Sequence, residues 1–161
     1  MNDVREISDL IARMLLDIDR LDWAGVRRTF AARVQVDYTS LFNGSPTEQD
    51  ADELIATWTG LLPGFDATQH LVGPIVVNAN NGSITAETSV RGYHVVSGAP
   101  GGTVWMVAGV YTFGVTAAPS SWLITSLRLT VSYQEGNPDL VQLAQQRVAA
   151  GQLRQPNAST P

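Results

Sequence analysis

The chain has 161 residues, a hydrophobic fraction of 44% and a formal net charge of −5. This length predicts one domain with a sizeable core, and the acidic balance excludes the clustered basic surface that a nucleic-acid partner requires. Without cysteine, disulfides and thiolate chemistry are excluded, and with no signal-peptide core and no apolar run of membrane-spanning length we expect a cytoplasmic protein that binds no membrane.

The chain begins with a predicted amphipathic helix that carries one unusual carboxylate. Apolar residues from Ile7 to Leu21 recur at helical spacing. Asp19 falls between Leu15 and Leu16 on the helical wheel, within the apolar flank. Its ordinary interpretation is a solvated carboxylate near a helix end, but this position favours a functional one.

Helix, strand, loop and helix follow in turn. Residues 22–31 form a short helix, residues 33–41 alternate like a strand, and residues 42–47 have loop composition. Residues 47–62 are predicted to form a helix that ends at Pro63-Gly64. The capping candidates of these two helices are Asp22, Thr47 and Asp50.

The second half of the chain is predicted to form a sheet. Four strands are expected at 68–78, 83–97, 103–116 and 121–133, with turns at 80–82 and 98–102, a terminal helix at 139–149 and a flexible tail at 151–161. Helices that precede consecutive hairpins indicate an α+β domain over residues 1–150. We expect a curved antiparallel sheet with helices on one face, closed into a cone around an apolar pocket.

Both histidines of the chain lie in apolar strand segments. His94 shares the parity of Val90 and Val96 in a strictly alternating stretch, and His70 shares the parity of Val72. Two imidazoles that face an interior suggest a site that moves protons near neutral pH. The alternatives are a core histidine satisfied by a backbone carbonyl for His94 and a solvent-facing strand end for His70.

Several segments together resemble a known family. The chain from about residue 5 to 145 resembles the SnoaL-like branch of the NTF2-like (cystatin-like α+β cone) superfamily, and within it most of all the scytalone dehydratases. The segments that carry this resemblance are Asp19-Arg20-Leu21-Asp22-Trp23, Val36-Asp37-Tyr38-Thr39-Ser40, Thr68-Gln69-His70-Leu71-Val72-Gly73, His94 and Trp122-Leu123-Ile124.

The resemblance implies a set of catalytic residues. It pairs the Asp19 carboxylate with His94, makes Tyr38 a group that polarises a substrate carbonyl, and lets His70 exchange the other proton. Taken alone, Tyr38 would be a core tyrosine with its hydroxyl at the surface. The chain departs from the family pattern at three positions, which are Ile18, Gly109 and Tyr111, and Tyr111 could take over part of the polarising role.

Further apolar residues are candidates for the pocket wall. We expect substrate contacts from Met14, Leu41, Trp58, Leu62 and Tyr111, although tryptophans are most often core residues. The sequence has no helical HExxH spacing and we predict no metal site, while strand histidines can still converge. No glycine-rich phosphate loop is present, and we expect no cofactor.

These features favour a cofactor-independent lyase. The expected reaction removes water from a small hydrophobic hydroxy-carbonyl compound of polyketide, aromatic or steroid-like type. His70 would be the base, and His94, charged by Asp19, would be the acid. The alternatives are a polyketide cyclase, a ketosteroid-type isomerase, a non-catalytic ligand-binding protein and a purely structural assembly domain. We also expect a homo-oligomer, either a dimer or a trimer.

Overall fold

The structure is a computed structural model that describes residues 2–80 and 82–156. Asn81 of the predicted turn at 80–82 and the last five residues of the predicted tail lie outside the described residues. The helices are α1 (Asn2–Arg20), α2 (Trp23–Thr29), α3 (Thr39–Phe42), α4 (Ala51–Thr59), the 3-10 turn η1 (Leu62–Gly64) and α5 (Leu140–Ala149). The strands are β1 (Phe30–Asp37), β2 (Thr47–Asp50), β3 (Ala67–Val72), β4 (Val76–Asn80), β5 (Ser83–Val95), β6 (Val104–Ala118) and β7 (Ser121–Gly136).

The strands form one seven-stranded sheet in the order β2-β1-β7-β6-β5-β3, with β4 paired to β5 beside β3. The hairpins β5–β6 and β6–β7 are antiparallel, as the sequence predicts. The expected all-antiparallel sheet is wrong at one place, because β1 pairs with β7 in parallel. β1 comes from the helical first half of the chain, so no hairpin turn dictates its direction beside β7.

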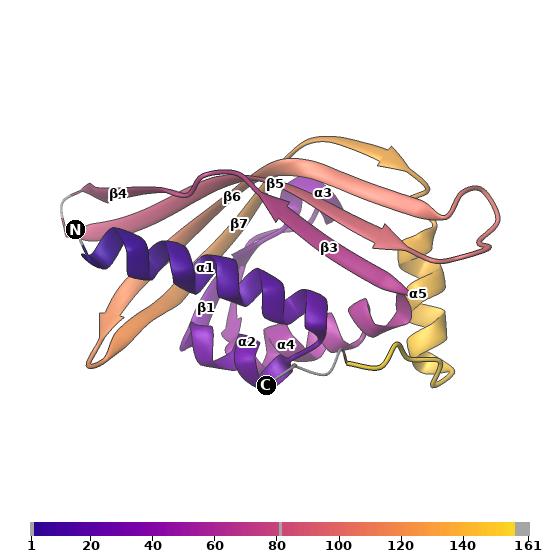
Figure 1. The fold of residues 1–161 in the computed structure, drawn as a ribbon, viewed down its shortest axis with the longest axis horizontal. Helices are drawn as coiled ribbons and strands as arrows, with labels where there is room; N and C mark the ends of the chain where they lie inside the picture. Colours follow the sequence, from indigo (N-terminus) through magenta and orange to yellow (C-terminus); the bar gives the residue numbers. More distant parts are fainter. Residues whose placement is uncertain (1, 81, 157–161) are drawn as a thin grey trace.

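Helices cover one face of this curved sheet, and α1 runs along it beneath β3 and β4 (Figure 1). The periodic apolar residues of α1, among them Ile7, Ile11 and Ile18, are buried against the sheet. Their spacing at three and four residues places them on one side of the helix. The α+β fold class expected from the sequence is therefore confirmed. No helix in the described part of the chain is long and apolar enough to cross a membrane.

Local sequence signals account for most element boundaries, with three exceptions. Residues 39–41, predicted to belong to the strand at 33–41, begin helix α3 instead. Asp22 is the N-cap of α2 and accepts a hydrogen bond from the Gly25 N–H, and Asp50 forms a capping box with Glu53 at the start of α4. Residues 47–50 were predicted to be helical but form the edge strand β2, which pairs with β1. The predicted strand at 68–78 breaks at residues 73–75, where Pro74 cannot donate to a ladder.

Helix α5 closes one end of the sheet through contacts with the segment that precedes β3. Asp66 accepts hydrogen bonds from Arg147 of α5 at 2.6 Å and from the Ser97 N–H at 2.7 Å. Gly64 lies directly against the backbone of α5, where a Cβ would stand 2.0 Å from the Ala144 carbonyl oxygen. Only glycine permits this approach, which places the start of β3 and therefore His70.

We predict that Gly64→Ala destabilises the protein by about 2 kcal/mol or more, because the added methyl group meets backbone that cannot rotate away. Gly60→Ala is the matched control, since its Cβ would make an ordinary 3.4 Å contact and its backbone is already helical. Urea unfolding of the two variants and the parent checks this. Equal stability of the two variants would contradict the close packing of η1 on α5.

Candidate active site

A cavity of about 330 Å³ lies between the sheet and the helices, and its wall is mainly apolar. The strands contribute alternate side chains to it because only every second residue of a strand faces inward. The lining residues are Ile18, Val36, Tyr38, Thr39, Leu41, Phe42, Asn43, Ser45, Thr47, Gln49, Leu54, Thr57, Trp58, Leu61, Leu62, His70, Val90, Gly92, His94, Trp105, Val107, Tyr111 and Leu129.

The Asp19 carboxylate holds His70 at two points. Its Oδ2 accepts the His70 backbone N–H at 2.7 Å, and its Oδ1 lies 2.8 Å from the ring Nδ1. The backbone contact is available because β3 ends the sheet order and its outer N–H groups have no strand partner. One carboxylate thus satisfies the edge of β3 and orients the ring that β3 carries.

The last turn of α1 is arranged to present this carboxylate. Leu21 ends the helix in the left-handed conformation, with φ of 59°, and its side chain is buried. The Asp22 N–H returns to the Asp17 carbonyl at 2.9 Å, which closes the helix end. A left-handed leucine costs free energy that the surrounding packing must supply, and the turn determines where Asp19 stands.

The pairing selects the tautomer of the neutral His70 ring and keeps Asp19 ionised. Because an ionised carboxylate only accepts hydrogen bonds, the ring hydrogen of neutral His70 resides on Nδ1 and Nε2 keeps a lone pair. Burial by itself raises the pKa of Asp19, but the hydrogen bonds and the charge of His70 outweigh it and leave that pKa below its ordinary value. Asp19 therefore stays ionised and holds the His70 ring through Nδ1.

His94 stands next to this pair in a drier environment. Its ring packs against Phe65 and Trp105, with centroids 4.9 and 4.7 Å away, and it lies 6.1 Å from the His70 ring. Both imidazoles border Gly92, where a side chain would take the space between them. Burial, together with repulsion from His70, lowers the pKa of His94 to about 3, so His94 is neutral near pH 7.

The pairing of Asp19 with His94 that the resemblance implied is therefore wrong. Both carboxylate oxygens are on His70, and the polar contact of the His94 Nδ1 is the Trp105 carbonyl at 3.4 Å. The physical reason is the strand order. The end of α1 lies against β3, and β5, which carries His94, is one strand further into the sheet.

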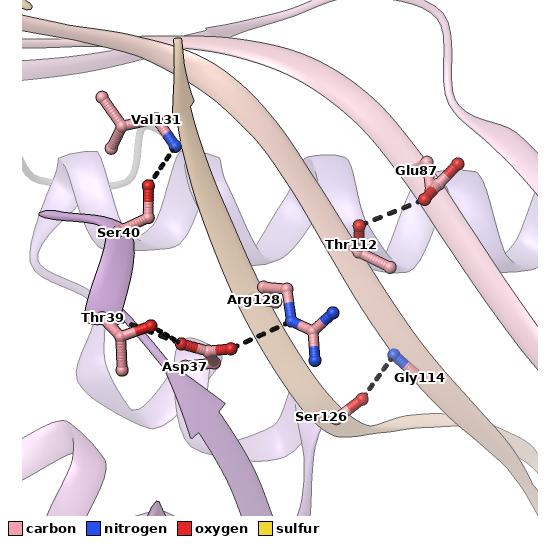
Figure 2. Close-up of polar contacts among 9 residues, drawn as sticks. All are labelled: Asp37, Thr39, Ser40, Glu87, Thr112, Gly114, Ser126, Arg128 and Val131. Carbon is pink, nitrogen blue, oxygen red and sulfur yellow. Dashed lines mark hydrogen bonds and ion pairs between the residues drawn. The ribbon is translucent and has the colours of Figure 1, made fainter. Parts of the chain in front are cut away.

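The residues that flank Tyr38 at the junction of β1 and α3, Asp37 and Thr39, lie beside β7 with Ser40 (Figure 2). Asp37 accepts from the Thr39 hydroxyl at 2.7 Å and from Arg128 at 3.0 Å, and the Ser40 hydroxyl accepts the Val131 N–H at 2.7 Å. Since β1 ends at Asp37, Ser40 replaces the missing strand as a partner of β7. The residues that flank Tyr38 are thus fixed, which directs its ring into the cavity.

Tyr38 meets Tyr111 of β6 inside the cavity. Both tyrosines line the cavity together with Trp58, and their hydroxyl groups act on one another's pKa. Burial raises the pKa of Tyr38 well above its ordinary value and that of Tyr111 to about 12. Both phenols therefore keep their hydrogens at neutral pH and can donate them to a ligand oxygen.

The structure brings most of the predicted site residues to this cavity. Leu41, Trp58, Leu62 and Tyr111 line it, whereas Met14 is buried in the core and is not among the lining residues. The polar residues at the α3–β2 side, such as Gln49, were not foreseen because residues 47–50 were predicted to be helical. The catalytic roles of Asp19, Tyr38, His70 and His94 stay predictions.

Two other predictions concern a metal site, which was not expected, and the tail at residues 151–161, which was expected to be flexible. Among the described residues, no group of three or more histidine, aspartate or glutamate side chains could hold a metal ion. Residues 151–156 of the predicted flexible tail are placed against the domain, where the Arg154 N–H donates to the Pro63 carbonyl at 2.8 Å.

The buried neutral His94 predicts a specific pH dependence of stability. Its pKa is about 3 in the folded protein and 6.5 when it is solvated, so between these values the unfolded chain binds a proton that the folded protein does not. The free energy of unfolding should therefore fall as the pH falls from about 6.5, with a slope approaching about 1.4 kcal/mol per pH unit. His94→Gln should remove this slope.

Urea unfolding of the parent and His94→Gln at several pH values between 4.5 and 7.5 measures this. The difference in unfolding free energy between the two proteins is the relevant quantity, because the Asp19 contribution is common to both. Parallel pH curves would show that His94 is not held neutral by burial.

Comparisons with known proteins place this fold. The chain matches the model of the SnoaL-like domain over residues 1–128. The Kfla4162 protein from Kribbella flavida has a similar structure, with a TM-score of 0.79 and 25% identity over 89% of this chain and 97% of that one. A search among curated proteins gives no match.

Two further solved structures share the fold at lower identity. A candidate scytalone dehydratase from Novosphingobium aromaticivorans has a TM-score of 0.72 and 14% identity over 100% of both chains. A type 3 hexachlorocyclohexane dehydrochlorinase, LinA, from Novosphingobium barchaimii has a TM-score of 0.65 and 14% identity over 83% of this chain and 89% of that one. The predicted NTF2-like cone is confirmed, and this chain belongs to the SnoaL-like domain family.

Proposed function

We propose that this protein is a cofactor-independent lyase that removes water from a small, largely apolar hydroxy-carbonyl compound. The observation that carries this proposal is the two-point hold of Asp19 on His70, which leaves a histidine nitrogen with a lone pair at an apolar cavity. Two proteins of similar fold are named for reactions of the same type, loss of water and loss of hydrogen chloride. Each removes a proton and a leaving group from neighbouring carbons.

His70 would take the proton in the first step. Its Nε2 removes the hydrogen from the carbon next to the substrate carbonyl, and the C–H electron pair moves into the enolate. The imidazolium that forms is stabilised by the ionised Asp19 at 2.8 Å. Because His70 and Asp19 are both largely buried, this attraction is weakly screened by water.

Tyr38 and Tyr111 would stabilise the enolate. Both hydroxyls stay protonated at neutral pH, and they come from two different elements of the cavity wall, the β1–α3 junction and β6. A pair of donors that is already in place for a developing oxyanion is an efficient way to lower the barrier. The carbonyl carbon of a bound substrate would then lie between the tyrosines and the His70 ring.

The second step would expel the hydroxyl group. The enolate electrons form the new carbon–carbon double bond, the C–O bond breaks, and the His70 imidazolium returns its proton to the departing oxygen, which leaves as water. The base is thereby restored and no electrons are left over, so the reaction needs no cofactor. His94 does not fit the acid role expected from the sequence, because a histidine that is neutral near pH 7 carries no proton to spare.

The position of His94 beside His70 supports His70 as the residue that carries the proton. Two imidazolium ions 6.1 Å apart would repel each other strongly in an apolar site, so only one ring can be charged at a time. His94 is the drier ring and has no carboxylate partner, whereas His70 has Asp19. The proton therefore goes to His70.

The cavity limits the substrate to a small molecule. A volume of about 330 Å³ is at the lower end of the range for ligand pockets. Its wall combines aromatic and aliphatic side chains with two histidines and two tyrosines. A compact ring compound with one carbonyl oxygen matches this distribution.

The Asp19–His70 pair, the dyad of this site, predicts that His70→Ala and Asp19→Asn lose proton-transfer activity. We expect each to lower the rate about 10²- to 10⁴-fold because the general base is removed or no longer oriented. The assay incubates the protein in D₂O with a panel of small hydroxy-ketones, follows exchange of the hydrogen next to the carbonyl by NMR, and identifies products by mass. Asp17→Asn is the matched control, since Asp17 is a buried carboxylate of the same helix that pairs with Arg20.

The products decide between the proposal and its alternatives. Dehydration gives a product lighter by one water. A product of unchanged mass with a shifted double bond would indicate an isomerase, and ring closure without loss of water would indicate a cyclase. Tight retention of compounds without exchange would indicate a binding protein, and each of these outcomes would overturn the dehydratase proposal.

The tyrosine pair predicts a separate loss. Tyr38→Phe and Tyr111→Phe should each lower the exchange rate about 10²-fold, because each removes a donor to the enolate oxygen and leaves the base intact. Tyr133→Phe is the control, since Tyr133 is exposed and its hydroxyl accepts from Arg91. Unchanged exchange rates in both cavity variants would remove the tyrosines from the mechanism.

A further inference from the structure

The chain returns to the Asp19–His70 pair after the sheet is complete. Beyond α5, residues 151–156 run back beneath the molecule toward the end of α1 (Figure 1). Two backbone hydrogen bonds fix this path, from the Gln152 N–H to the Arg147 carbonyl and from the Arg154 N–H to the Pro63 carbonyl, both at 2.8 Å. The second brings Arg154 to η1, directly before β3.

The Arg154 side chain enters the protein from this segment. Its Nη2 donates to the Thr68 hydroxyl oxygen at 3.1 Å. Its Nε is fully buried and, among the described residues, is the only fully buried side-chain nitrogen or oxygen without a hydrogen-bond partner. A partly buried guanidinium with a donor to spare costs free energy, and such a group often has a role beyond packing.

Thr68 connects Arg154 to the dyad. It lies two residues before His70 on β3 and therefore on the same face, and only 8% of it is exposed. Arginine can only donate, so the Thr68 oxygen must accept from Arg154. The hydroxyl hydrogen is then free to point toward Asp19, which accepts the His70 N–H two residues further along β3 and whose pKa Thr68 helps to lower.

Few charged groups lie near the contacts that run from Arg154 through Thr68 to Asp19. Asp19 and Asp66 are the acidic groups that act on Arg154, and Asp66 already receives Arg147 and the Ser97 N–H. His94 faces His70 from β5 and is neutral near pH 7. Asp19 is therefore the carboxylate of the Asp19–His70 pair whose orientation Arg154 can influence through Thr68.

We propose that Arg154 is a positioning residue that orients the Thr68 hydroxyl toward Asp19 and so fixes the carboxylate that holds His70. Neither Arg154 nor Thr68 lines the cavity, so the effect reaches the substrate only through Asp19 and His70. In its catalytic consequence this inference rests on the proposed function. Its structural part, the order of the dyad, does not.

The test uses NMR of the two ring systems, because the chain contains only His70 and His94. Nitrogen-15 shifts identify the His70 Nδ1–H form, and the exchange of its ring hydrogen with water measures how firmly Asp19 holds it. In the full-length protein, Arg154→Met keeps the length of the side chain and removes the charge and the donors. We expect the Nδ1 hydrogen to exchange about tenfold faster or more in this variant.

Three comparisons separate positioning from general loosening. Arg147→Met is the matched control, since it releases α5 from Asp66 and leaves Thr68 untouched, and it should not change the His70 signal. Thr68→Val should accelerate the exchange of the His70 Nδ1 hydrogen as much as Arg154→Met does. The double variant should exchange about as fast as either single variant, because both substitutions break the same chain of contacts. Arg154→Lys keeps a cationic donor, so in this variant the His70 Nδ1 hydrogen should exchange with water more slowly than in Arg154→Met.

The outcomes also separate this inference from the proposed function. Unchanged His70 exchange in Arg154→Met, or an equal change in Arg147→Met, would overturn the positioning role whatever the protein catalyses. Faster ring-hydrogen exchange without substrate turnover in any variant or the parent would support the positioning role while the lyase proposal fails. If both hold, Arg154→Met should also lower substrate deuterium exchange about tenfold, mainly in kcat.

Discussion

The carboxylate of Asp19 is the group on which the rest of the site depends. It joins α1 to the edge strand β3 through the His70 backbone, and it joins the same helix to the imidazole through Nδ1. Backbone and side chain of one residue are thus fixed by one partner. The pairing serves the fold, because it satisfies a strand edge, and it serves the site, because it orients the His70 ring and selects the Nδ1–H tautomer of its neutral form.

Burial then sorts the remaining polar groups of the cavity by charge. Asp19 is ionised because its hydrogen bonds and the charge of His70 outweigh desolvation, while His94 is neutral and both tyrosines keep their hydrogens because desolvation prevails. The result is an ionised carboxylate on one histidine, with neutral donors in an apolar wall. Such a division of roles suits proton removal next to a carbonyl without any cofactor.

The two solved structures named for elimination reactions share the fold with this chain. Identities of 14% with a candidate dehydratase and a dehydrochlorinase show that the cone accommodates very different sequences. A fold of this kind hosts many activities, so function has to be argued from the site. Here the site consists of a carboxylate from α1, a histidine from β3 and two tyrosines that the β1–α3 junction and β6 provide.

Local patterns in the sequence determine the long elements, the inward parity of His70 and His94, the capping by Asp22 and Asp50 and, with the family resemblance, the cone. They depend on spacing along a single segment, and so one sequence suffices to predict them. The parallel pairing of β1 with β7, the partner of Asp19 and the contact of Arg154 with Thr68 were decided by tertiary structure alone. Each joins segments far apart in the chain, and the choice between His70 and His94 depends on which strand lies at the sheet edge beside α1.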